Sequence, residues 1–200
     1  SRGAFVQSGA DYNTISFSTI IGGTRGIWIF GSDSNTVTQS YISGANAGAQ
    51  LDAGSEYNTI SLSTMISSGL IGYFLNGADS NTVTQSYIEG AVDGVLLAAG
   101  SNFNAISLST LVGVGGSGLN AQSSDSNMVS QSYMTGNNIG ATLDTGSDYN
   151  AISFSTMIGA TGDGLYALAA GSNSVISSYL WGATNGANLD TGSNYNGISL

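Results

Sequence analysis

Apolar and polar residues alternate over short stretches along the whole chain. Each stretch is three or four residues long, rich in Ile, Val and Thr, and bounded by Gly, Ser, Asn or Asp, as in the segment "TVT" at 36–38. A period of two is typical of short β-strands that bury one face, and no segment shows helical spacing of comparable strength. The pattern therefore predicts an all-β protein.

The alternation itself recurs every 22 or 23 residues, in register with an asparagine. Ile or Val stands two positions after each asparagine, a serine five after, and Ile, Leu or Met seven after. A unit with three short strands cannot enclose a core alone, so successive units must stack, each strand pairing in parallel with its counterpart. We predict a parallel β-solenoid of about nine coils with three strands per coil. The nine asparagines are Asn13, Asn35, Asn58, Asn81, Asn104, Asn127, Asn150, Asn173 and Asn196.

The recurring Asn, the aliphatic positions and a Gly-Ile step together resemble the right-handed parallel β-helix repeat family. This family includes pectate-lyase-like enzymes, phage tailspikes, and bacterial surface and autotransporter-like passenger proteins. The resemblance covers essentially the whole chain and implies a single-stranded right-handed β-helix, but not one function, because the fold hosts many. We expect residues 1–200 to form one continuous solenoid segment, uncapped at both ends and part of a longer array.

Neighbouring coils are of two kinds, so the building block is a coil pair of 46 residues: "DSNTVTQSYISG" at 33–44 returns as "DSNTVTQSYIEG" at 79–90. Just before the asparagine, Tyr or Phe alternates with Ser; four and six positions after it, Phe or Leu alternates with Gln, and Thr with Tyr. Large and small side chains can pack over one another, or the rings can face outward as a stacking surface for sugars or another solenoid. The predicted surface contacts are Tyr41, Tyr87, Tyr133, Tyr179, Gln39, Gln85 and Gln131.

The composition of the chain limits the classes of molecule that it can bind. The chain carries a net charge of −10 with only two basic residues, and it has no His, Lys, Cys or Pro. Nucleic acid is excluded as a partner because phosphate binding needs a basic surface. No apolar run is long enough to span a membrane. We interpret the asparagines as a structural ladder, since stacked amides satisfy one another's hydrogen bonds.

Carboxylates form a second column two residues before the asparagines, at Asp11, Asp33, Glu56, Asp79, Asp125 and Asp148. Calcium prefers six to eight oxygen ligands, and a single file offers one side chain per coil. The sequence therefore predicts no cofactor or metal site, and at most weak, nonspecific Ca²⁺ binding at this column. Another recurring turn position holds Asp52, Asp144 and Asp190, which we interpret as surface variation.

Catalysis should show as a break in the repeat where polar residues converge. The recurring serine has no His or Lys to activate it. We expect the residues that depart from the repeat to lie at different turns on distant coils, so we predict no catalytic residues and no enzyme. These residues are Arg25, Trp28, Glu89, Asp93, Asp163 and Trp181.

Our leading hypothesis from the sequence is a non-catalytic structural segment of a large secreted or cell-surface protein. It would act as an adhesin-like rigid stalk, filament or spacer whose partner is itself, through end-to-end or lateral stacking. A carbohydrate-binding or polysaccharide-processing β-helix is the alternative. A lesser alternative is an ice-binding solenoid, suggested by paired Thr and Ser beside the first aliphatic residue of each coil.

Overall fold

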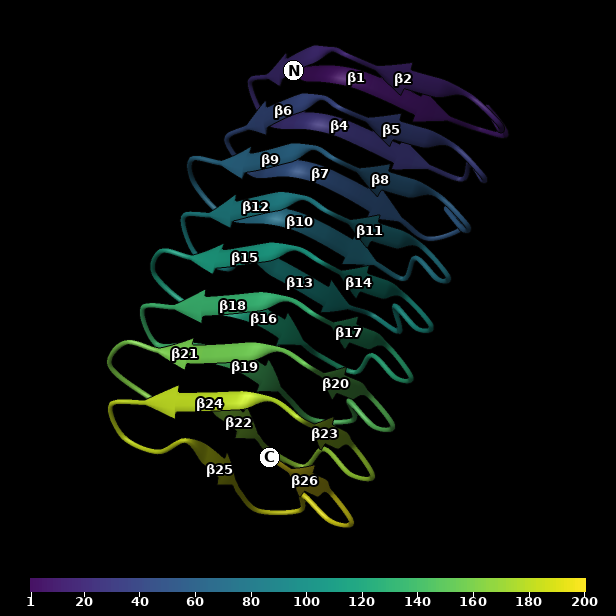
Figure 1. Ribbon diagram of the computed structural model, residues 1–200. Helices are drawn as coiled ribbons and strands as arrows, with labels where there is room; N and C mark the ends of the chain where they lie inside the picture. Colours follow the sequence, from purple (N-terminus) through teal and green to yellow (C-terminus); the bar gives the residue numbers. More distant parts are fainter.

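The computed structural model describes all 200 residues as a parallel β-solenoid. Twenty-six short strands form three sheets of nine, nine and eight strands, which confirms the predicted fold class. Figure 1 shows the coils stacked from the N-terminus to the C-terminus. No element of the structure is a helix that could cross a membrane.

Each coil contributes one strand to each sheet, except where sheet C ends one strand earlier. Sheet A contains β1 (Arg2–Gln7), β4 (Arg25–Phe30), β7 (Ala47–Asp52), β10 (Ile71–Asn76), β13 (Val95–Ala98), β16 (Ser117–Ala121), β19 (Ile139–Leu143), β22 (Leu165–Ala167) and β25 (Ala187–Leu189). Sheet B contains β2 (Thr14–Ser16), β5 (Thr36–Thr38), β8 (Thr59–Ser61), β11 (Thr82–Thr84), β14 (Ala105–Ser107), β17 (Met128–Ser130), β20 (Ala151–Ser153), β23 (Ser174–Ile176) and β26 (Gly197–Ser199). Sheet C contains β3 (Thr19–Gly22), β6 (Tyr41–Gly44), β9 (Thr64–Ser67), β12 (Tyr87–Gly90), β15 (Thr110–Gly113), β18 (Tyr133–Gly136), β21 (Thr156–Gly159) and β24 (Tyr179–Gly182).

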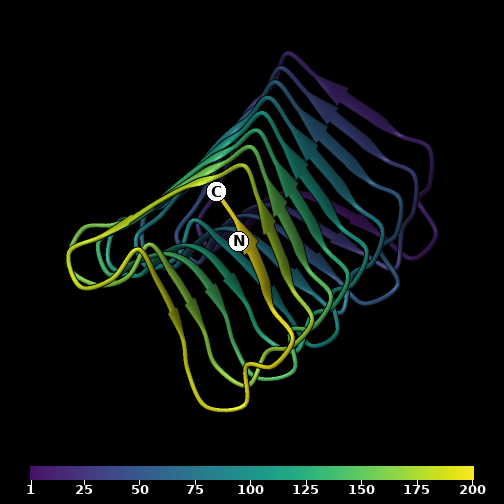
Figure 2. The same cartoon turned by 60° about the horizontal axis from the view of Figure 1, so that its bottom comes forward.

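The sequence period sets the register between coils. Val83 lies opposite Ile60 of the preceding coil and Ile106 of the next, all pointing inward from sheet B. The coils consequently keep a similar outline along the stack (Figure 2). The second residue of β4, Gly26, has no room for a side chain, because a Cβ there would lie 2.5 Å from the carbonyl oxygen of Gly48.

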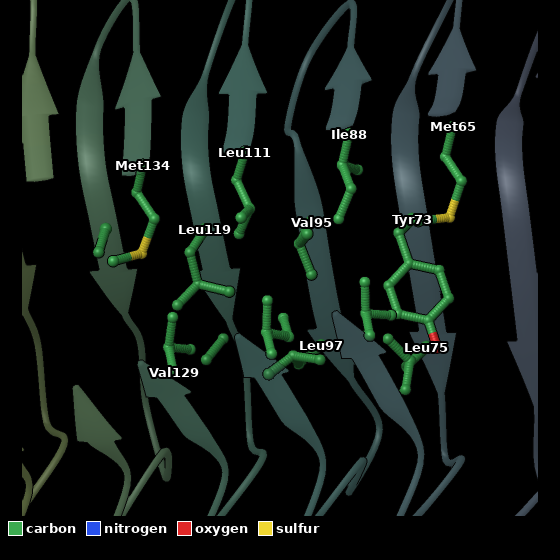
Figure 3. Packing of buried hydrophobic residues seen from close by; sticks show 14 of the residues in the cluster. Met65, Tyr73, Leu75, Ile88, Val95, Leu97, Leu111, Leu119, Val129 and Met134 are labelled. Atoms are coloured by element: carbon green, nitrogen blue, oxygen red, sulfur yellow. The ribbon is translucent and has the colours of Figure 1, made fainter. Parts of the chain in front are cut away.

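The interior is one continuous core of 30 buried residues to which all three sheets contribute. Figure 3 shows Met65, Ile88 and Leu111 of sheet C pointing toward side chains of sheet A. Tyr73 is the one aromatic residue in this core, and its hydroxyl has no hydrogen-bond partner. Burial raises the pKa of Tyr73, because the tyrosinate would lose its hydration.

The asparagines form a hydrogen-bonded ladder between sheets A and B. The Oδ1 atom of Asn81 accepts from the backbone N–H of Asn58 at 2.9 Å and from its Nδ2 at 3.1 Å. A serine ladder runs in the same direction at the corner between sheets B and C, where the N–H of Ser63 donates to Oγ of Ser86 at 3.2 Å. Because each rung accepts from the one before it, these polar side chains are buried with their hydrogen bonds made, except at Asn173, whose Nδ2 has no partner.

The acidic column is a third ladder. Asp33 Oδ1 accepts the backbone N–H of Glu56 at 2.8 Å, and Asp125 Oδ1 accepts that of Asp148 at 2.8 Å. Asn102 stands in the same column and does the same with its amide oxygen, which accepts the N–H of Asp125 at 2.7 Å. The position therefore needs an oxygen acceptor rather than a negative charge. No group of three or more carboxylates gathers where it could hold a metal ion.

Candidate functional site

The outward residues of sheet A do not follow the repeat. Sheet B presents mostly Thr and Ser to the outside, whereas sheet A presents aromatic, amide, hydroxyl and aliphatic side chains in no regular order. Since the scaffold does not require this variety, this face is where a specific site is expected. In register, its central column is Phe5, Trp28, Gln50, Phe74, Leu96, Asn120, Thr142, Tyr166 and Asn188.

The only two arginines of the chain lie together at the N-terminal end of this face. Arg2 and Arg25 are register partners on β1 and β4, and their guanidinium carbons lie 4.1 Å and 4.7 Å from the ring centroid of Trp28. Arg2 also lies 4.2 Å from the ring of Phe5, which stacks on Trp28 with 4.6 Å between centroids. Cation–π attraction holds the two like charges on one aromatic platform.

A buried carboxylate lies beside this platform. Asp52 accepts hydrogen bonds from Nε1 of Trp28 at 2.5 Å, Nε2 of Gln50 at 2.8 Å and Nδ2 of Asn76 at 3.1 Å. Gln50 in turn accepts from Nε of Arg25 through its Oε1 atom. Asp52 is only 7% exposed, so the interpretation of this residue as surface variation is wrong. Its carboxylate fixes the Trp28 indole and the Gln50 amide, and these two groups hold Arg25. We call Arg2, Phe5, Arg25, Trp28, Gln50, Asp52 and Asn76 the arginine cluster.

The arginines of this cluster contact no carboxylate. Their partners are two ring faces and an amide oxygen, while the donors to Asp52 are an indole and two amides. In a chain with twelve acidic residues, both cations thus keep charged N–H groups available for an external acceptor.

The rest of the sheet A face is acidic and amide-rich. Asp93 accepts from the backbone N–H of Ser117 at 2.7 Å and from Asn120 Nδ2 at 3.0 Å. Asp163 is held by Asn185 and Asn188 at 2.7 Å and 3.0 Å.

Toward the C-terminal end, the Tyr166 hydroxyl donates to Asp190 at 3.0 Å, and this hydrogen bond raises the pKa of Tyr166. The backbone N–H of Thr191 lowers the pKa of Asp190, with Tyr166 as the second cause. The face as a whole is therefore cationic at one end and anionic over the rest.

The departures from the repeat converge in part, which corrects the sequence-based expectation. Arg25 and Trp28 meet in the arginine cluster, and Asp93 and Asp163 lie farther along the same sheet A face. Glu89 and Trp181 lie on sheet C. Sequence reasoning missed Gln50 and Asn76 altogether. A signal was present: the only two basic residues are 23 positions apart, which is one coil.

The surface contacts predicted from the sequence lie at the corner between sheets B and C. The four tyrosines start strands of sheet C and are 38–59% exposed. The three glutamines stand at the corner itself, with φ of 48–50°. Only one of these residues has a carboxylate neighbour: the hydroxyl of Tyr87 donates to Glu89, which raises the pKa of Tyr87 to about 12. Their role as ligand contacts stays a prediction.

Comparison with known proteins establishes the class. Residues 1–111 match the family described as "Right handed beta helix region", so the chain belongs to this family, and the predicted family and hand are confirmed. No curated protein sequence matches the chain at a significant level.

Several solved structures share the fold. The A-module of a mannuronan C-5 epimerase from Azotobacter vinelandii has a TM-score of 0.80 at 13% identity, over 95% of this chain and 58% of its own. A double mutant of a periplasmic alginate epimerase has a TM-score of 0.79 at 11% identity, over 94% and 50%. DFA-IIIase from Arthrobacter chlorophenolicus has a TM-score of 0.61 at 12% identity, over 99% and 53%. The chain spans about half the length of these proteins, and the likeness at such low identity concerns the fold.

These neighbours correct the prediction that the chain is not an enzyme. That prediction used the absence of His, Lys and Cys and the lack of a convergent polar group. It is contradicted, because structures of this fold are named as epimerases and as DFA-IIIase. Its second premise also fails at the arginine cluster, where charged and polar side chains from β1, β4, β7 and β10 meet.

Proposed function

We propose that this chain is the carbohydrate-binding part of a polysaccharide-processing β-helix protein, and that the outer face of sheet A binds an acidic polysaccharide. One observation carries the proposal: Arg2 and Arg25 stack on Trp28 with no carboxylate partner, beside the buried Asp52 that holds the platform. The names of the similar epimerases, which mention alginate and mannuronan, support a polysaccharide as the ligand.

The chemistry of the cluster matches a sugar acid. A guanidinium binds a carboxylate through two parallel hydrogen bonds, and its planar shape lets it do so while stacked on an aromatic ring. Exposed aromatic edges and faces beside it, such as Phe30 at 45% exposure, provide apolar contact for pyranose rings. A neutral polysaccharide would leave both guanidinium charges without a counter-charge.

A polysaccharide that leaves the arginine cluster along sheet A passes over the carboxylates Asp93 and Asp163. Both are held by amide or backbone donors in one orientation. Processing needs a group that accepts or donates a proton close to the sugar, and we assign this role to carboxylates of the sheet A face rather than to the turn column. Since such a polymer lies outside the cytoplasm, we propose a periplasmic, extracellular or cell-surface location.

Binding of oligouronates tests this function, measured by calorimetry at two salt concentrations. We expect Arg2→Gln combined with Arg25→Gln to weaken binding by about a hundredfold or more, because charge-assisted hydrogen bonds contribute about 1.5–3 kcal/mol each. Glu89→Gln, which changes a charge on sheet C outside the cluster, is the control, and we expect it to leave the affinity unchanged. Detection of new reducing ends or altered sugar units after incubation with the polymer reports processing separately. Equal binding of neutral and acidic oligomers, or unchanged binding by the double variant, contradicts the proposal.

The stalk, self-association and ice-binding hypotheses stay predictions, and no feature of the three sheets favours them over carbohydrate binding. Absence of thermal hysteresis at micromolar protein would remove the ice-binding hypothesis.

A further inference from the structure

A second surface of the molecule carries bulky side chains where the backbone favours glycine or asparagine. We number the coils from the one that contains Asn13. In every odd coil one such residue precedes the ladder asparagine, and in the first four odd coils another follows the sheet B strand, all at φ between 49° and 59°. A side chain in this left-handed region is strained, and for aromatic or branched residues it is rare. We call these residues the aromatic edge: Tyr12, Tyr57, Phe103, Tyr149, Tyr195, Phe17, Leu62, Leu108 and Phe154.

Packing does not explain the aromatic edge. The rings before the asparagines are 62–92% exposed, and the residues after the sheet B strands are 51–77% exposed. Even coils use Ser at the first position and, in three of four cases, Gln at the second, with the same backbone conformation. The interpretation that the rings fill space above a neighbouring serine is therefore wrong for this surface. The scaffold builds the same turn without the rings.

The spacing of the aromatic edge suits an extended chain of sugar rings. Its residues recur every second coil, and two strand spacings amount to about 9–10 Å. This distance is close to the length of two pyranose units in an extended polysaccharide, so every second sugar would meet a ring. The aromatic edge has two rows, one before the asparagines and one after the sheet B strands. Between these rows, sheet B presents hydroxyls such as those of Thr59 and Ser61, which can form hydrogen bonds with the hydroxyls of a sugar.

The charge beside the aromatic edge selects the kind of sugar. The acidic ladder runs one residue before the rings, and Glu56 and Asp148 directly precede Tyr57 and Tyr149. Both arginines lie on sheet A, so no basic side chain of the chain neutralises these carboxylates. Adjacent carboxylates one coil apart repel each other, and a cationic ligand relieves this repulsion. An ammonium group over a tyrosine face adds cation–π attraction.

We propose that the aromatic edge and the adjacent acidic ladder form a second carbohydrate site, whose ligand is a cationic amino-sugar polysaccharide such as a polymer of glucosamine. Its pyranose rings stack on the odd-coil rings, and its ammonium groups pair with the carboxylates. This site is independent of the arginine cluster and of the function proposed for it.

Binding of chitosan oligosaccharides tests the second site, with their N-acetylated counterparts and oligouronates as comparison ligands. We expect the protonated amino-sugar oligomer to bind, and to lose affinity at a pH where its amines are neutral. Combining Tyr57→Ser, Phe103→Ser and Tyr149→Ser places the even-coil residue at three odd coils, so the fold is kept while affinity falls by about tenfold or more. Circular dichroism checks the fold.

A second pair of substitutions isolates the charge. Asp79→Asn with Asp125→Asn keeps the ladder acceptor, as Asn102 shows, and we expect weaker binding with a smaller salt dependence. The arginine double variant keeps this binding intact, which separates the two sites. Equal binding of the N-acetylated oligomer or a basic peptide overturns the proposal. So does full binding by the triple variant, or concentration-dependent dimerisation of the wild type that the triple variant abolishes.

Discussion

Two outward surfaces of the same solenoid differ in how far they repeat. The outward side chains of sheet A differ from coil to coil, and the two arginines meet their aromatic and polar partners at one place only, the arginine cluster. The turns around sheet B repeat every two coils and place the same exposed ring in each odd coil. An aperiodic cluster can recognise one unit or one end of a polymer, whereas a periodic row can contact a polymer along its length. In a repeat protein, a regular row of exposed side chains thus indicates a ligand that is itself a repeating polymer.

The largest loss of stability is expected in the periodic region, at the buried asparagine ladder that joins successive coils. Asn81→Ala removes the acceptor of the Asn58 backbone N–H and Nδ2, both buried, and we expect a loss of about 2–4 kcal/mol of unfolding free energy. Asn13→Ala, at the exposed first rung, should cost about 1 kcal/mol or less. Urea denaturation measures both. Similar losses for the two variants would show that burial of the ladder does not matter.

Next in size is the buried carboxylate of the aperiodic face. Asp52→Asn brings a donor toward three donors, so we expect about 1–3 kcal/mol of lost stability and a changed near-ultraviolet circular dichroism signal from Trp28. Asp144→Asn, at a corresponding but half-buried position, should change stability by about 0.5 kcal/mol or less. Equal effects at the two positions would remove the distinction between a site residue and surface variation.

A gain of stability is expected from a substitution in the core, which lies beneath both surfaces. Tyr73→Phe removes a buried hydroxyl that has no partner, and we expect unfolding to require about 1 kcal/mol more. Neither proposed ligand should bind differently, because Tyr73 faces the core (Figure 3). A weakened oligouronate affinity would mean that the core beneath sheet A takes part in recognition.

The smallest expected effect concerns Glu89, a residue that departs from the repeat and lies beside Tyr87, one of the recurring tyrosines of sheet C. Glu89 raises the pKa of Tyr87 to about 12, above the ordinary value of 10.0. Between these values the folded chain retains a proton that the unfolded chain has released, so this contribution to stability is present below pH 10 and disappears as the pH rises toward 12. Glu89→Ser, which copies residues 33–44 into 79–90, should lower the pKa of Tyr87 in a spectroscopic titration. An unchanged titration would show that Glu89 is not the cause.

The periodic part of the molecule could be predicted from the sequence, and the aperiodic part could not. The asparagine register fixes sheets B and C, because their strands start at constant offsets from it. Strands of sheet A follow a turn of variable length: Trp28 lies 15 positions after Asn13, but its column mate Phe74 lies 16 after Asn58. Asn76, 18 positions after Asn58, therefore could not be aligned with Asp52, 17 positions after Asn35. The exposure of the aromatic edge was equally out of reach, since alternation of large and small residues fits both packing and display.

The ladders have a consequence for how such a protein evolves. Each ladder asparagine donates its backbone N–H to the following coil and accepts the same bond from the preceding one, so a 46-residue pair presents the same hydrogen-bonding groups at its end as at its start. Duplicating or deleting a pair within the array leaves every junction intact. Such an event would change the length of the aromatic edge by one residue in each row while the arginine cluster remains a single copy. Selection could thus lengthen one surface without altering the other.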